Sequence, residues 1–100
     1  MQYAAPPLAL HFDTSVVESA ARRSAARARA LINRAACDDQ QNALSVAALQ
    51  FDSAARHLHR GDIDQARESL RAACNYAASE EANAPHLASA ARTLLATIPA

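Results

Sequence analysis

Arginine is the residue type whose number and spacing in this chain could do chemistry. All ten basic residues are arginines, and five of them fall in one short segment as Arg22, Arg23, Arg27, Arg29 and Arg34. If this segment is helical, with about 100° between successive residues, Arg23, Arg27 and Arg34 project within about 60° of one another and the other two flank them. Guanidinium groups pair with phosphates and carboxylates through two parallel hydrogen bonds. The segment therefore predicts an anion-binding face on one helix.

Three interpretations of this arginine face follow from the charges around it. Residues 1–37 carry a net charge of +3 and residues 38–100 a net charge of −3, so the whole chain is neutral. The plainest interpretation is a solvated face balanced by Asp13, Glu18 and acids of neighbouring helices. The second is a surface that binds an acidic protein. The third is a surface for nucleic acid, which ranks last because no aromatic residue lies among the arginines and the chain has no excess of positive charge.

The histidines at the end of the second expected helix point to helix capping and not to metal binding. His57 and His59 lie beside Arg56 and Arg60, and cations near a helix C-terminus interact favourably with the helix dipole. Two histidines two residues apart point to different faces of a helix, so we expect no metal ion there. Asp52 stands four residues before Arg56, and the two are expected to form an exposed ion pair.

Catalytic and cofactor-binding patterns are absent from the sequence. It contains no nucleophile with a recognisable base, no glycine-rich phosphate loop and no Glu-x-x-His pair. Cys37 and Cys74 lack the spacing of zinc ligands, and we expect both to be reduced and buried as small hydrophobic residues. Arg60, Gly61 and Asp62 spell an integrin-binding tripeptide, but a helix end followed by a helix start explains all three. We therefore expect no enzyme, no cofactor and no metal.

Alanine determines the expected fold class. It accounts for 28 of the 51 hydrophobic residues and is the best helix former, and only 21 larger apolar residues remain to fill a core, so helices must pack closely. Apolar residues recur at helical spacing in four segments, which predicts helices from residue 13 or 15 to about 36, from 39 or 40 to 60, from 62 to about 79 and from a cap at 83 or 84 to about 98. Their short connectors predict an all-α fold, a small four-helix up-down bundle forming one domain over residues 13–100. Residues 1–12 include Pro6 and Pro7 and are expected to form an extended N-terminal arm.

The clearest boundary signal lies within residues 47–78, which are expected to form a helical hairpin. Gly61 is the only glycine in the chain and suits the left-handed conformation that often follows the end of a helix. Asp62 can accept hydrogen bonds from the first turn of the next helix. Gln65, three residues on, stands where a capping box has Glu or Gln.

This hairpin resembles one tetratricopeptide-type unit. Gly61 and Asp62, followed by Ala66, Leu70 and Ala73, stand at the spacings of the second helix of that family. The first helix and the closing position depart from the family pattern, which has Trp, Leu, Gly, Tyr and a final Pro where this chain has Gln50, Ser53, Ala54, His57 and Ala78. The resemblance covers about a third of the chain, in a single unit. It implies a protein-binding scaffold with no catalytic residues to carry over.

These features together predict a class of function. The chain shows neither the pattern of a signal peptide nor an apolar run near 20 residues, so we expect a cytoplasmic protein without a membrane partner. We expect a non-catalytic module for protein–protein interaction, such as an adaptor, chaperone, regulatory subunit or inhibitor, that binds an acidic partner through the arginine face. The alanine-rich stripes are also compatible with a homodimer, and the alternative function is a nucleic-acid-binding helical domain that uses the same arginines. The lysine-free composition is typical of a GC-rich bacterial or phage gene, and a phage or mobile-element inhibitor of host machinery fits this size.

Overall fold

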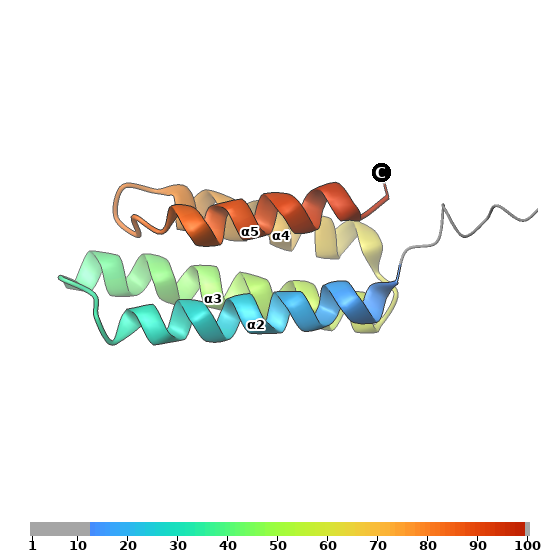
Figure 1. Cartoon of the computed structure of the whole chain (residues 1–100), viewed down its shortest axis with the longest axis horizontal. Helices are drawn as coiled ribbons and strands as arrows, with labels where there is room; N and C mark the ends of the chain where they lie inside the picture. The colour runs from blue at the N-terminus through green and yellow to red at the C-terminus, as the bar shows by residue number, and fades with distance from the viewer. Residues whose placement is uncertain (1–12, 100) are drawn as a thin grey trace, which may run out of the picture.

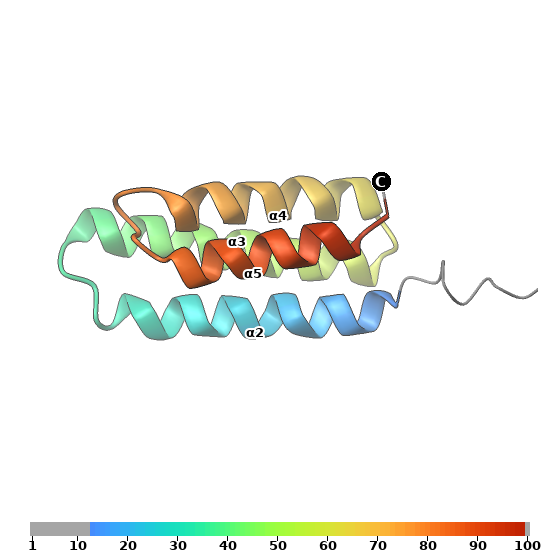
Figure 2. The same ribbon diagram turned by 45° about the horizontal axis from the view of Figure 1, so that its top comes forward.

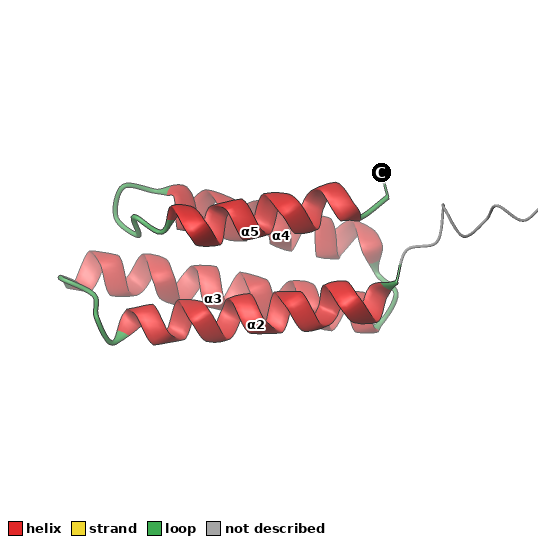
Figure 3. Cartoon of the chain, viewed as in Figure 1, coloured by secondary structure: helices red, strands yellow, loops and turns green. Residues whose placement is uncertain are grey.

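Four α-helices make up the part of the chain that the structure, a computed structural model, describes: residues 13–99. They are α2 (Thr14–Ile32), α3 (Asp38–His59), α4 (Ile63–Ala78) and α5 (Pro85–Thr97), joined by short connectors (Figures 1 and 3). The predicted all-α class and the four-helix up-down bundle are confirmed. The predicted extended arm, residues 1–12, lies outside the described residues.

Each helix packs antiparallel on the next one in the chain. α2 packs on α3, α3 on α4 and α4 on α5, and α2 and α5 close the bundle over the smallest of the four interfaces. α2 and α4 make no direct contact and lie diagonally across the bundle (Figures 1 and 2). The smallest interface of the bundle is therefore the one between its first and last described helices.

Residues 60–63 form the tight link between α3 and α4 that the sequence predicts. Gly61 has a φ of +78°, in the left-handed region that favours glycine. The N–H of Asp62 donates to the His57 carbonyl at 2.8 Å, and the Asp62 side chain accepts from the N–H of Gln65 at 3.4 Å. Gly61 therefore follows the end of α3, and Asp62 is the N-cap of α4.

The two ends of α2 differ in how well they follow the sequence signals. Of the two predicted starts, Asp13 is the N-cap: its carboxylate accepts from the N–H of Ser15 at 3.0 Å and from the Ser15 hydroxyl at 2.7 Å. The prediction that this helix reaches about residue 36 is wrong, because α2 ends at Ile32. Gln40 of the next helix accepts from the N–H of Ala36 at 2.6 Å and donates to the Ala82 carbonyl at 3.1 Å, so it ties the α2–α3 connector to the α4–α5 connector.

The starts of α3 and α5 lie close to their predicted positions. α3 begins at Asp38, slightly earlier than expected, and Cys37 occupies the cap position without a side-chain hydrogen bond. Asp38 therefore lies in the first turn of α3. Its negative charge there interacts favourably with the positive end of the helix dipole. Ala84 caps α5, with Pro85 in the first turn, where a missing N–H leaves no hydrogen bond unmade.

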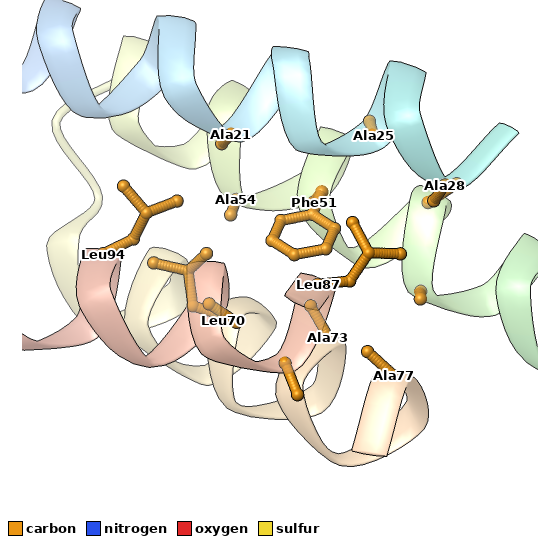
Figure 4. Packing of buried hydrophobic residues seen from close by; sticks show 14 of the residues in the cluster. Ala21, Ala25, Ala28, Phe51, Ala54, Leu70, Ala73, Ala77, Leu87 and Leu94 are labelled. Atoms are coloured by element: carbon orange, nitrogen blue, oxygen red, sulfur yellow. The ribbon is translucent and has the colours of Figure 1, made fainter. Parts of the chain in front are cut away.

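Alanines from all four helices line the core, and a few larger side chains fill it. Phe51 lies at the centre among Ala21, Ala54, Leu70 and Leu87 (Figure 4). Fully buried alanines occupy positions on every helix, which allows the backbones to approach closely. The largest fully buried side chains are few: Phe51, Leu44, Leu58, Leu70, Leu87 and Val17.

No helix within residues 13–99 combines the length and the apolar character that a membrane span requires.

Replacing Phe51 with alanine is expected to lower the free energy of unfolding by about 3–5 kcal/mol, because it opens a cavity where the side chain is 0% exposed. Leu49 on the same helix is 60% exposed, so Leu49→Ala is the matched control and is expected to stay within about 0.5 kcal/mol of the wild type. Urea unfolding followed by circular dichroism measures both. Equal losses in the two variants would contradict the described core.

Candidate functional site

The structure separates the five arginines of the predicted face into two sets on opposite sides of α2. Arg22 and Arg29 lie on the side of α3 and are paired within the bundle. Arg22 donates to the Glu18 carboxylate at 3.0 Å, and Arg29 forms an ion pair with Asp52 of α3. The predicted pair of Asp52 with Arg56 is therefore replaced by a contact between helices. The carboxylates of Glu18 and Asp52 therefore neutralise these two arginines.

The second set, Arg23, Arg27 and Arg34, is exposed, and these arginines make no ion pair within residues 13–99. Arg27 lies on the side of α5, at the edge of a hollow of about 420 Å³ between the two helices that His86 of α5 also lines. Arg23 lies one turn before Arg27 on the same side of α2. α5 contains no acidic residue, so no carboxylate of that helix is available to these guanidinium groups.

Arg23 and Arg27 belong to a regular pattern along the outside of α2, which Arg34 continues in the turn after Ile32. Val16, Arg23 and Ala30 follow one another at intervals of seven residues, and so do Ala20, Arg27 and Arg34. A seven-residue repeat keeps one seam of a helix facing a partner helix. We call this seam the basic stripe: Val16, Ala20, Arg23, Arg27, Ala30 and Arg34. Val16 is 60% exposed, so the stripe also presents an apolar side chain to its surroundings.

Glu18 connects α2 to the end of α3. Its carboxylate accepts from Arg22 and lies 3.4 Å from Nδ1 of His59. The hydrogen bond from Arg22 is the largest cause that lowers the pKa of Glu18, and the nearby His59 lowers it further. The hydrogen bonds from Ser15 lower the pKa of Asp13 in the same way. Both carboxylates therefore favour their charged form in the folded protein.

The two histidines of the predicted helix end lie in the last turn of α3, each near a carboxylate. His57 Nδ1 is 3.9 Å from the Asp62 carboxylate, and His59 faces Glu18 as described. Within residues 13–99, no three His, Cys, Asp or Glu side chains gather as ligands for a metal ion. Each of the two histidines therefore lies near a different carboxylate, and the four groups do not form one cluster.

The prediction that both cysteines are buried is wrong for Cys37. Cys37 is exposed in the α2–α3 connector, because α2 ends early and the connector leaves the bundle. Cys74 is half-buried, with its Sγ 3.6 Å from the Ala88 carbonyl and 3.6 Å from the Arg92 guanidinium. Both are free thiols.

A second surface, which the sequence did not indicate, is a groove between α3 and α4. It has a volume of about 530 Å³ and is lined by Asp39, Asn42, Ala43, Val46, Asn75, Tyr76, Ser79 and Glu81. Its apolar lining residues are Ala43, Val46 and Tyr76, whose side chain is 44% exposed. Its charged lining residues are Asp39 and Glu81, and no basic residue lines it. Its residues come from segments about 30 positions apart, so only the pairing of the helices brings them together. We call it the acidic groove.

Comparison of the chain with protein-family models, with curated proteins and with solved structures gives no match. The resemblance of the α3–α4 hairpin to a tetratricopeptide unit therefore stays a prediction.

The lowered pKa values predict a loss of stability in acid. A carboxylate whose pKa is lowered by folding stabilises the folded state above its unfolded-state pKa, and this contribution disappears as the pH falls through the folded-state pKa. The free energy of unfolding is therefore expected to fall between about pH 5 and pH 3, and less steeply in Glu18→Gln. Urea unfolding across this range measures the slope. Glu80→Gln is the control, since Glu80 is exposed and makes no ion pair within the described residues; equal slopes in Glu18→Gln and wild type would refute the assignment.

Proposed function

We propose that this chain is a non-catalytic module for protein–protein interaction and that the basic stripe of α2 binds an acidic surface of a partner protein. The observation that carries the proposal is the division of the arginines. Two of the five are paired with carboxylates of the same chain, while Arg23 and Arg27 on α2 and Arg34 just after it are exposed and have no carboxylate partner among the described residues. These three are the charges available to a partner.

The spacing of the stripe suits a partner helix or strand that presents carboxylates at regular intervals. Arg23 and Arg27 are separated by about 6 Å along the helix axis, and Arg34 follows in the turn just after α2. Small residues at positions 20 and 30 leave room for close approach between the arginines. Charge complementarity of this kind accelerates association and selects the partner. A partner with acids at matching spacing is thus favoured over a uniformly acidic surface.

The hydroxyl groups of the bundle support a non-catalytic role. Within residues 13–99, their hydrogen bonds join them to a carboxylate, to backbone groups or to another hydroxyl, as in the 3.2 Å contact between Ser69 and Ser53. None pairs a hydroxyl with an imidazole, the arrangement that activates a serine nucleophile. The exposed thiol of Cys37 fits a reducing compartment such as the cytoplasm. An adaptor, chaperone, regulatory subunit or inhibitor needs no more than a stable scaffold and one binding surface.

The variant Arg23→Glu/Arg27→Glu is expected to lose at least about tenfold in capture of the partner, because it places two negative charges against an acidic surface. The tagged chain is used to capture proteins from a lysate of the cells that carry the gene, with and without nuclease. The control Arg56→Glu/Arg60→Glu changes the same number of charges at exposed arginines of α3 and its C-cap and is expected to capture normally.

The outcomes of this experiment separate the two candidate classes of partner. A protein retained after nuclease and lost with Arg23→Glu/Arg27→Glu supports the proposal, provided that circular dichroism shows unchanged helix content. Recovery that disappears with nuclease, and that weakens steeply as salt increases, contradicts it and assigns the arginines to nucleic acid. Equal capture by both variants would exclude the basic stripe as the binding surface.

A further inference from the structure

We propose that the acidic partner of the basic stripe is a second copy of this chain, whose acidic groove receives the stripe. The inference rests on the proposed function and names its partner. It follows from the composition of the two surfaces, from their spacing and from their places on the bundle.

The two surfaces have complementary charge. The groove presents Asp39 and Glu81 and no basic residue, while the stripe presents Arg23, Arg27 and Arg34 and no acidic residue. Neither groove carboxylate makes an ion pair within residues 13–99. The whole chain has no net charge, so two copies do not repel each other and opposite local charges can meet.

The apolar residues that the bundle leaves exposed lie on or beside the same two surfaces. Among residues 13–99, the large hydrophobic side chains with substantial exposure are Val16, Leu49 and Tyr76. Val16 belongs to the stripe and Tyr76 lines the groove. Leu49 lies one turn beyond Val46 on α3, outside the residues that line the groove. A contact between the stripe and the groove would therefore remove Val16 and Tyr76 from water, which favours association.

The spacing of apolar and charged residues matches between the two surfaces. Val16 and Arg23 of the stripe are seven residues apart, and so are Val46 and Asp39 of the groove. Both intervals span about 10 Å along a helix axis. When α2 of one copy lies antiparallel to α3 of the other, Val16 meets Val46 and Arg23 meets Asp39. Arg27 lies one turn further along the stripe, which leaves it for Glu81 on the other wall of the groove.

The two surfaces lie on different parts of the bundle, so one copy can use both at once. The stripe is on α2, and the groove lies between α3 and α4, the helix diagonal to α2 (Figure 2). A contact between two different surfaces is heterologous, so each copy can bind one neighbour through its stripe and another through its groove, and the contact can repeat from copy to copy.

Sedimentation velocity of the full chain tests the inference, from low micromolar to near-millimolar protein at low and at high salt. A reducing agent is present so that the exposed Cys37 cannot link copies covalently. Wild type is expected to self-associate and to dissociate as salt increases. Arg23→Glu/Arg27→Glu alone and Asp39→Arg/Glu81→Arg alone are each expected to weaken association at least about tenfold. Arg56→Glu/Arg60→Glu is the control for charge and is expected to behave as wild type.

A mixture of the two charge-reversed variants is the decisive arm. In the mixture, the unchanged stripe of one variant meets the unchanged groove of the other, and the two reversed surfaces are complementary as well. Association is therefore expected to return when the variants are combined. A wild-type chain that stays monomeric at every concentration, or a mixture that stays monomeric, overturns the inference. Lysate capture of a different protein through Arg23 and Arg27 would then still support the proposed function, so the two can fail separately.

Discussion

Close approach of the helices along alanine-lined interfaces is the constraint on which the rest of this structure depends. An alanine buries little apolar surface. The larger side chains at a few positions, such as Phe51, Leu44 and Leu70, must therefore fill the rest of the core. Thin interfaces of this kind require accurate helix rotation, because a turned helix would replace alanine by a charged or bulky residue. The rotation of α2 that buries Ala21, Ala25 and Ala28 consequently determines where its arginines project.

The neighbours of α2 then decide what each arginine can do. α3 presents Asp52 and His59 toward α2, and this side of the helix holds its charges in internal pairs. α5 has no acidic residue, and the smallest interface of the bundle lies between it and α2. The asymmetry of α2, with one side neutralised and one side available, is therefore a property of which helices flank it and not of α2 alone.

The sequence predicts those parts of the fold that local chemistry controls. Helix starts and ends that are set by capping residues within one turn agree with prediction, as at Asp13, at Gly61 and Asp62, and at Pro85. The end of α2 at Ile32 differs from the predicted end near residue 36, and Gln40 joins the connector that follows to the distant α4–α5 connector. The sequence predicts the arginine face, but the division of that face depends on which helices lie beside α2. The acidic groove could not be recognised because α3 and α4 contribute its two walls from separate segments.

The neutrality of the chain limits how its charged surfaces can work. A net charge of zero gives little long-range attraction, and at physiological salt a charge is screened within about 8 Å. Recognition must therefore occur at short range, where spacing matters more than total charge. The seven-residue intervals of the basic stripe meet this requirement, because they place guanidinium and small apolar groups at fixed positions on a rigid helix. Selectivity then requires that the spacing of residues on the partner match the spacing on the stripe. A binding partner is therefore recognised by the order of its acidic and apolar residues.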